Sequence, residues 1–258
     1  MSVAIFIVTH DNPIETAYFL DTLFTETAYD FRLYIYDFYN GNEDMKNMLI
    51  TATNKSKGQY IQLNKFDSKE FKQMSDLKGN ISLAHIYNSM LSKMTEDYGV
   101  FLSINFLVSK GWLKDLVYYN TSIKNSGCSS IGHTFKNIAL TSALFEDETK
   151  SEPVMKTIWV NATNTFNEFV FFSKDTYEKQ KIGLVDTTFE IKGHELSEWS
   201  FRFLNKGLCN YYISHNSAIK YKIENDILFP AVTDVGKKEL IKKINEKSKN
   251  SNQINGII

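Results

Sequence analysis

The chain has 258 residues, 43% of them hydrophobic, which is enough to fill the core of one large domain or two closely packed ones. A formal net charge of −1 gives no overall attraction to nucleic acids or acidic membrane surfaces. The only cysteines are Cys128 and Cys209, which excludes a disulfide framework and a zinc site built from cysteines. No apolar run approaches the ~20 residues of a membrane span, and the first run lacks a basic leader, so we expect a cytoplasmic protein.

Strands and helices are predicted to alternate along the first half of the chain. The apolar run from Val3 to Val8 has the length of a strand, and Asp11-Asn12-Pro13 is typical of a turn that opens a helix. The next predicted elements are a helix over 14–24, a strand over 31–36, a helix over 45–53, a strand over 60–63, a helix over 81–94, a strand over 99–104 and a helix over 112–119. The nearly continuous apolar run of 99–104 is typical of a central strand covered on both faces.

The second half has a weaker pattern. We predict a strand over 168–172, a short helix over 174–180, a helix over 196–206 that ends at Gly207, and a strand over 209–214. Residues 134–156 are expected to form an exposed excursion. From Gly236 onward the sequence predicts a lysine-rich amphipathic helix and a frayed tail. Because glutamates interrupt these lysines, the tail gives no strong nucleic-acid signal.

Alternating strands and helices indicate an α/β fold whose sheet is mostly parallel in its first half. Ligands of such sheets bind beyond the carboxyl ends of the strands. This rule places three loops around one crevice, namely residues 9–12, 37–42 and 103–105.

Several short segments follow one another in an order that is typical of one enzyme family. These segments are Thr9-His10-Asp11-Asn12, Asp37 with Asn40-Gly41-Asn42 after it, Asn80-Ile81-Ser82 before a helix that contains Asn88, Gly111-Trp112-Leu113, Ile182-Gly183-Leu184-Val185-Asp186, Glu195, Arg202 and His215. Together they cover roughly residues 2–215. In this order they resemble the nucleotide-sugar-dependent glycosyltransferases of the GT-A fold, specifically the large inverting family 2.

The resemblance implies a GT-A-like, Rossmann-type α/β/α sandwich with a central mixed, mostly parallel sheet. It implies a transferase domain over residues 1–220, in which 1–110 form the nucleotide-binding half and 111–220 the acceptor half. Residues 221–258 would be a C-terminal extension. The implied reaction transfers a sugar, with inversion, from a nucleotide sugar of the UDP- or GDP-sugar class to a hydroxyl of a glycan or another acceptor.

The resemblance also implies roles for particular residues. Asp37 would contact the nucleotide base, and we expect its side chain to be partly exposed. Glu195 and Glu198 share a helix face, so either would serve as the catalytic base. Asn105 and His215 are the candidate metal ligands. The residues expected to contact the nucleotide sugar are Thr9, Asn12, Asp37, Asn40, Asn80, Asn88, Ser103, Asn105 and Arg202.

Two positions depart from the family's pattern. Ser103-Ile104-Asn105 stands where the family has an Asp-x-Asp motif, which holds a divalent cation against the diphosphate. Because such cations prefer carboxylate oxygens, we expect dependence on Mn²⁺ or Mg²⁺ to be weak or absent. Leu196 stands where the family has its catalytic aspartate. The two losses leave an alternative open, a GT-A-like binding or structural module that is catalytically inactive.

Overall fold

The computed structural model describes residues 1–10, 12–39, 41–63, 83–136, 158–160, 166, 168–187 and 195–221. In this part of the chain the strands are β1 (Val3–Thr9), β2 (Phe31–Asp37), β3 (Gln59–Gln62), β4 (Tyr98–Leu102), β5 (Phe106–Leu107), β6 (Ser126–Lys136), β7 (Ile158–Val160), β8 (Phe169–Ser173) and β9 (Cys209–Tyr221). The helices are α1 (Pro13–Glu26), α2 (Glu43–Lys55), α4 (Ala84–Lys93), α5 (Trp112–Ser122), α7 (Lys174–Lys179) and α8 (Glu195–Asn205).

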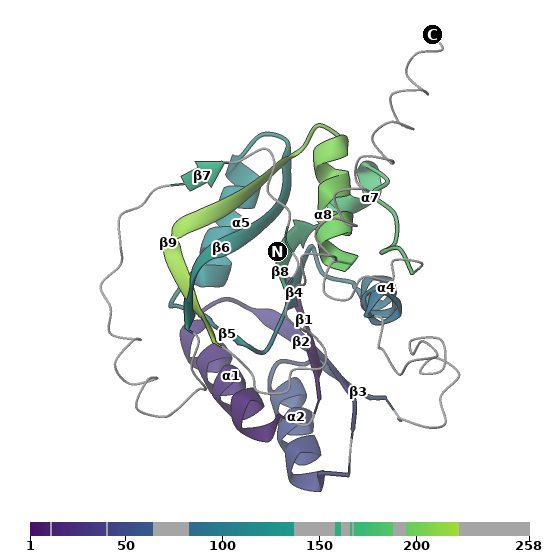
Figure 1. The fold of residues 1–258 in the computed structure, drawn as a ribbon, viewed down its shortest axis with the longest axis vertical. Helices are drawn as coiled ribbons and strands as arrows, with labels where there is room; N and C mark the ends of the chain where they lie inside the picture. The colour runs from purple at the N-terminus through teal and green to yellow at the C-terminus, as the bar shows by residue number, and fades with distance from the viewer. Residues whose placement is uncertain are drawn as a thin grey trace.

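The strands form a single mixed sheet in the order β3-β2-β1-β4-β8-β6-β9-β5, with β7 paired to β9 (Figure 1). Strands β3, β2, β1 and β4 are parallel to one another. Strand β8 then runs antiparallel to β4, and β6 is parallel to β9. The expected α/β fold with a mixed sheet is therefore confirmed, and parallel pairing prevails in its first half.

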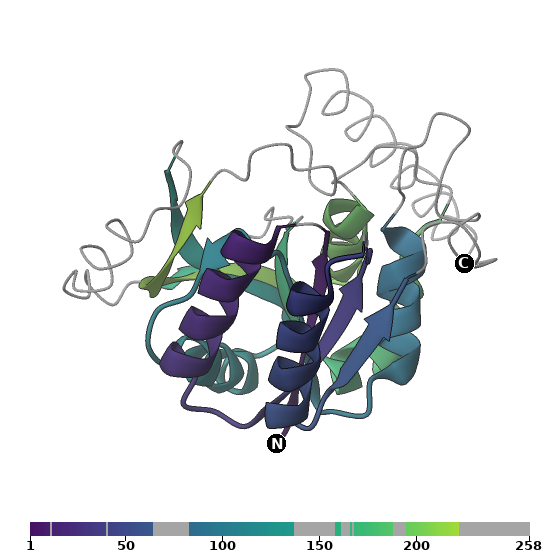
Figure 2. The same cartoon turned by 90° about the horizontal axis from the view of Figure 1, so that it is seen from below.

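Alternating side chains of β1 enter two separate cores. Val3, Ile5 and Ile7 pack into the core beneath α1, α2 and α5. The intervening residues of β1 pack into the core formed with α4 and α8. Helices therefore cover both faces of the sheet, and Figure 2 shows the parallel strands between α2 on one side and α4 on the other. This three-layer arrangement is the predicted sandwich.

Local sequence signals set several helix ends. Pro13 is the first residue of α1, where its missing N–H costs nothing. The Asn42 side chain accepts a hydrogen bond from the Met45 N–H at 3.0 Å and so caps the start of α2. After α8 the chain turns at Gly207, whose φ of 75° favours a glycine.

The sequence did not predict β6 or β7, and β9 continues seven residues beyond the expected end at 214, to Tyr221. Strand β6 begins with small and polar residues, Ser126 to Ser130, which show no alternation and little strand propensity. It forms because β8 and β9 supply its hydrogen-bond partners on both sides. Pairing with segments that are distant in sequence thus determines where these strands form.

Other expectations fall partly outside the described residues. The expectation of an exposed excursion was wrong for residues 134–136, because they pair with β9 as the end of β6. Residues 137–157, the lysine-rich segment and the predicted extension beyond Tyr221 lie outside the described part of the chain. Among the helices that are described, none is long and apolar enough to cross a bilayer.

Candidate functional site

The ends of several strands come together at one edge of the sheet, which we call the carboxyl edge. Thr9 ends β1, Asp37 ends β2, and the two residues lie opposite each other in register. Ser103 follows the last residue of β4, which is parallel to β1. Since β8 is antiparallel to β4, its first residue, Phe169, also lies at this edge, opposite Leu102. The predicted loops after β1, β2 and β4 therefore share one edge, where α/β proteins bind ligands.

Asp37 is the centre of a buried polar group at the carboxyl edge. The Thr9 hydroxyl donates to Asp37 Oδ1 at 2.8 Å, and the Tyr60 hydroxyl donates to Oδ2 at 2.9 Å. Asp37 is only 2% exposed, so the expectation of a partly exposed side chain was wrong. Its β-strand neighbours close over it because it belongs to the end of β2 and not to the loop that follows.

The surroundings of Asp37 change the acidity of Tyr60. Burial raises the pKa of the Tyr60 phenol far above its usual value, and the negative charge and hydrogen bond of Asp37 raise it further. Tyr60 therefore remains a hydrogen-bond donor at any physiological pH. Each oxygen of a carboxylate such as that of Asp37 can accept two hydrogen bonds.

The predicted asparagines have different positions. Asn12 stands at the start of α1, where its backbone carbonyl accepts from the Thr16 N–H at 2.9 Å. Asn40 and Asn80 lie outside the described residues, so their roles stay predictions. Asn88, on α4, binds the loop at Val185 with its side-chain amide. Its Nδ2 donates to the Val185 carbonyl at 2.9 Å, and its Oδ1 accepts from the Val185 N–H at 2.7 Å.

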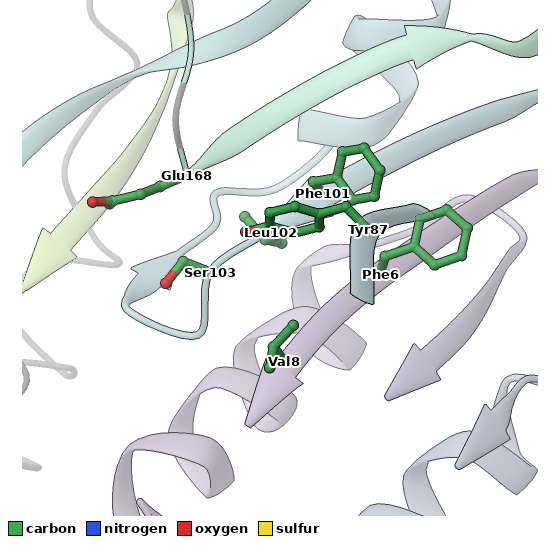
Figure 3. A pocket seen from close by; sticks show the side chains of 7 residues that line it. All are labelled: Phe6, Val8, Tyr87, Phe101, Leu102, Ser103 and Glu168. Atoms are coloured by element: carbon green, nitrogen blue, oxygen red, sulfur yellow. The ribbon is translucent and has the colours of Figure 1, made fainter. Parts of the chain in front are cut away.

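A small cavity opens beside the end of β4 (Figure 3). Its volume of about 10 Å³ is comparable to the space of one water molecule, so the cavity itself does not hold a nucleotide. Ser103 and Glu168 supply the polar part of its wall. The apolar part consists of Phe6, Val8, Tyr87, Phe101 and Leu102.

The turn after β4 contains buried polar atoms that are not satisfied. Ser103 is 2% exposed and Asn105 is 5% exposed. Among the described residues, neither Ser103 Oγ nor Asn105 Oδ1 has a hydrogen-bond partner. Buried polar atoms nearly always have partners, so this turn is suited to a polar ligand or solvent.

A lysine from β9 lies next to this turn. Lys220 Nζ is 2.5 Å from Glu168 Oε2, and it sits 5.7 Å from the centre of the Phe106 ring. Glu168 is tied to the turn from its other end, because its carbonyl accepts from the Ser103 N–H at 2.9 Å. Lys220 also pairs with Phe106 in register between β9 and β5. An ammonium group is thus fixed beside the turn that contains Ser103 and Asn105.

Helix α8 brings two buried carboxylates toward the same region. Ser200 Oγ accepts from the Phe166 N–H at 2.9 Å, and Phe166 stands two residues before Glu168 at the carboxyl edge. Glu195 and Glu198 lie in the first turn of this helix, and each is 2% exposed. Carboxylates near a helix N-terminus are stabilised by its dipole.

The two glutamates differ in what they bind. Arg202 donates from Nε to Glu198 Oε1 at 3.0 Å and from a terminal nitrogen to Oε2 at 2.6 Å, a bidentate ion pair one turn apart. Arg202 also donates to the Leu184 carbonyl at 2.7 Å. Glu198 and Arg202 thus support a loop, which makes Glu198 the weaker of the two candidates for a base.

The loop held by Arg202 has three other anchors. Both polar atoms of the Asn88 amide bind the Val185 backbone, as described above, and Trp199 Nε1 donates to the Gly183 carbonyl at 2.9 Å. Gly183 has a φ of 81°, which favours glycine at this turn. The indole of Trp199 is buried and packs edge-on against Phe172, so it does not present a face to a sugar.

The side chains at the turn after β4 do not fit a divalent cation. Such an ion prefers several carboxylate or carbonyl oxygens, whereas the described residues at the turn after β4 offer the Ser103 hydroxyl, the Asn105 amide and the Glu168 carboxylate, which is paired with Lys220. In the described residues, no group of three or more His, Cys, Asp or Glu side chains could hold a metal. The His215 backbone lies in β9, and its side chain is not among those described.

Sequence reasoning missed Tyr60, Glu168 and Lys220. Tyr60 and Glu168 fell inside predicted strands with no feature to distinguish them. Lys220 lay beyond the predicted end of the last strand, so nothing placed it near residue 103. No local signal identifies these three residues, because their partners are 23 to 52 residues away in sequence.

The strand order and the three layers define the class of protein: the chain has the α/β fold of GT-A glycosyltransferases. A structure of S. aureus TarS 1–349 in complex with UDP-GlcNAc matches 90% of this chain and 62% of its own, with a TM-score of 0.63 and 13% sequence identity. The mannosyltransferase PcManGT from Pyrobaculum calidifontis, in complex with GDP-Man and Mn²⁺, matches 87% of this chain and 58% of its own, with a TM-score of 0.59 and 12% identity. GalNAc-T7 with UDP, GalNAc and Mn²⁺ matches 86% of this chain and 44% of its own, with a TM-score of 0.61 and 12% identity.

The chain spans between 39% and 62% of the first three solved structures that it resembles. No protein-family model matches the sequence, and a search of curated proteins finds no match. At 12–13% identity the likeness shows the fold and leaves the chemistry to be argued from the site.

Proposed function

We propose that the chain is a glycosyltransferase that moves a sugar, with inversion, from a nucleotide sugar to an acceptor hydroxyl. The observation that carries this proposal is that Asp37 and the Ser103–Asn105 turn share the carboxyl edge of a sheet with the GT-A fold, and that α8, the helix of Glu195, is bound to Phe166 just before β8. The structural neighbours include proteins in complex with UDP-GlcNAc and with GDP-Man, which supports a donor of the UDP- or GDP-sugar class.

The donor would lie across the carboxyl edge. Asp37, held by Thr9 and Tyr60, would accept a hydrogen bond from the base of the nucleotide. The diphosphate would lie beside the turn at Ser103, whose unsatisfied hydroxyl can donate to a phosphate oxygen. Asn12, Asn40 and Asn80 remain proposed contacts of the donor.

Glu195 would act as the catalytic base. It would take the proton of the acceptor hydroxyl as that oxygen attacks the anomeric carbon, on the face opposite the departing nucleoside diphosphate. General-base catalysis of this kind contributes typically ~10²–10⁴-fold. Glu198 and Arg202 would act as positioning residues, because their bidentate pair and the bond to Leu184 fix the helix against its neighbouring loop.

The residues present at the turn after β4 also support weak or absent dependence on Mn²⁺ or Mg²⁺. This proposal rests on the chemistry of the ligands: among the described residues the carboxylate beside Ser103 is that of Glu168, and it is paired with the Lys220 ammonium. Nucleotide binding and sugar transfer should therefore be largely unchanged by EDTA. A strict requirement for Mn²⁺ would contradict this part of the proposal.

The deciding experiment is an assay of sugar release and transfer over a panel of UDP- and GDP-sugars with simple glycan acceptors, with and without Mn²⁺. Turnover that disappears in Glu195→Gln supports the proposal. Donor binding without any turnover favours the alternative, a catalytically inactive module, which the replacement at Leu196 and at Ser103–Asn105 motivates. Calorimetry with UDP and GDP separates the two cases from a chain that binds no nucleotide.

A further inference from the structure

We propose that Lys220 supplies the positive charge that faces the donor diphosphate, in the place that the fold's divalent cation would take. The inference rests on the proposed function, and it names the part of the donor that Lys220 recognises. Ser103-Ile104-Asn105 has no carboxylate where the family has two, and the Lys220 ammonium is fixed beside this segment.

The position of Lys220 is set from two sides. Strand β9 pairs with β5, which places Lys220 opposite Phe106, one residue after Asn105. The Glu168 carboxylate then holds Nζ at 2.5 Å, while the Glu168 carbonyl binds the Ser103 N–H. Figure 3 shows the Glu168 and Ser103 side chains in the wall of the same small cavity. The ammonium is therefore anchored to both ends of the turn.

The Lys220 ammonium has three N–H donors, and one contact with a carboxylate oxygen takes one of them. Its positive charge attracts an anion such as a phosphate. The Lys220 side chain is 21% exposed and that of Glu168 is 10% exposed, so the cation is the more open member of the pair. Glu168 acts as a positioning residue that orients the lysine.

The neighbours of Lys220 add donors of the same kind. Ser103 offers a hydroxyl with no partner among the described residues, and the Asn105 amide, whose Oδ1 is unsatisfied, carries two N–H groups. A hydroxyl, an amide and an ammonium suit phosphate oxygens better than they suit a metal ion. The turn therefore carries hydrogen-bond donors that suit an anion, where the family carries metal ligands.

The test is calorimetric binding of UDP and GDP, and of the matching nucleosides, to the wild-type chain and to Lys220→Met, all in EDTA. Loss of a hydrogen bond between charged groups should weaken nucleoside diphosphate binding roughly tenfold to a hundredfold. Nucleoside binding should stay within about twofold, since the base and ribose lie nearer Asp37. Lys220→Arg should retain most of the affinity because it keeps the charge.

Lys174→Met is a matched control. Lys174 is also partly exposed and paired with a glutamate, Glu178, yet it follows β8 at the opposite edge of the sheet. This variant removes the same charge and should leave UDP and GDP affinity unchanged. An equal loss in both methionine variants would show that only net charge matters, and it would overturn the proposal.

Lys220→Met leaves the Glu168 carboxylate without its partner, which can destabilise the fold. The double variant Glu168→Gln/Lys220→Met removes both charges and should show the same loss of diphosphate affinity. Glu168→Gln alone keeps the lysine and an amide oxygen that can still accept its hydrogen bond and orient it, so this variant should bind the diphosphate as well as wild type or better. Unchanged UDP and GDP affinity in the double variant would refute the role of Lys220 and leave the proposed function standing. Wild-type protein that binds no nucleotide would refute both.

Discussion

Replacement of Asp37 by alanine should reduce both the stability of the fold and its affinity for a nucleotide. The substitution removes the acceptor of two hydrogen bonds, from Thr9 at 2.8 Å and from Tyr60 at 2.9 Å. Two bonds to a charged group at about 1.5–3 kcal/mol each set an upper bound of about 3–6 kcal/mol. Because the folded chain no longer has to bury that charge, we expect a net loss of about 2–4 kcal/mol.

The assay is urea unfolding followed by the fluorescence of the buried tryptophans, Trp112 and Trp199. Asp37→Asn keeps the shape and one acceptor oxygen, so its loss should be smaller. Glu96→Ala is the control for binding: Glu96 is equally buried and accepts from the Tyr34 hydroxyl at 3.0 Å, but it precedes β4 at the other edge of the sheet. That variant should lose stability and keep its nucleotide affinity.

Two results would count against this reasoning. A free energy of unfolding for Asp37→Ala within about 0.5 kcal/mol of wild type would mean that the buried bonds contribute as little as a surface contact does. Equal nucleotide affinity in Asp37→Ala and wild type would remove Asp37 from the donor site, although its structural role would stand.

Three further predictions concern the residues around the carboxyl edge. Tyr60→Phe should be less stable than wild type below pH 10, and the difference should shrink as the pH rises above 10. The reason is that the pKa of Tyr60 is raised in the folded chain, so the unfolded chain loses this proton first as the pH rises. The stability that the protonated phenol contributes to the folded state is then lost. Urea unfolding of both proteins at pH 8 to 11 measures the difference, and a constant difference would contradict the assignment. Glu195→Gln should abolish sugar transfer while its affinity for the nucleotide sugar stays within a few-fold of wild type. Glu198→Gln should lower the free energy of unfolding by about 1.5–3 kcal/mol, because it weakens the pair with Arg202. Loss of transfer only in Glu198→Gln would assign the base to Glu198, one turn along α8. Asn88→Ala should cost about 1–3 kcal/mol by leaving the Val185 N–H and carbonyl without their partner, and an unchanged urea midpoint would show that Trp199 and Arg202 hold the loop alone.

Much of the fold could be predicted from the sequence because its signals are local. The apolar run that forms β1, the Pro13 start of α1 and the Gly207 end of α8 each depend on residues that are neighbours in the chain. The order of these elements then limits the sheet to few topologies. The sequence also placed Asp37, Ser103 and Thr9 at strand ends, which put them on one edge.

Only the tertiary structure decided what those residues touch. The burial of Asp37 depends on Tyr60, 23 residues away, and the charge beside Ser103 depends on Lys220, which is more than a hundred residues away. The same holds for β6, a strand of small polar residues that pairing with β8 and β9 creates. Periodicity reports which face of an element is apolar, but it holds no information on which distant side chain will meet a given polar atom. The sequence by itself therefore determined the α/β class and the edge at which to look, and long-range packing decided which carboxylate is buried, which glutamate is paired, and where a cation stands.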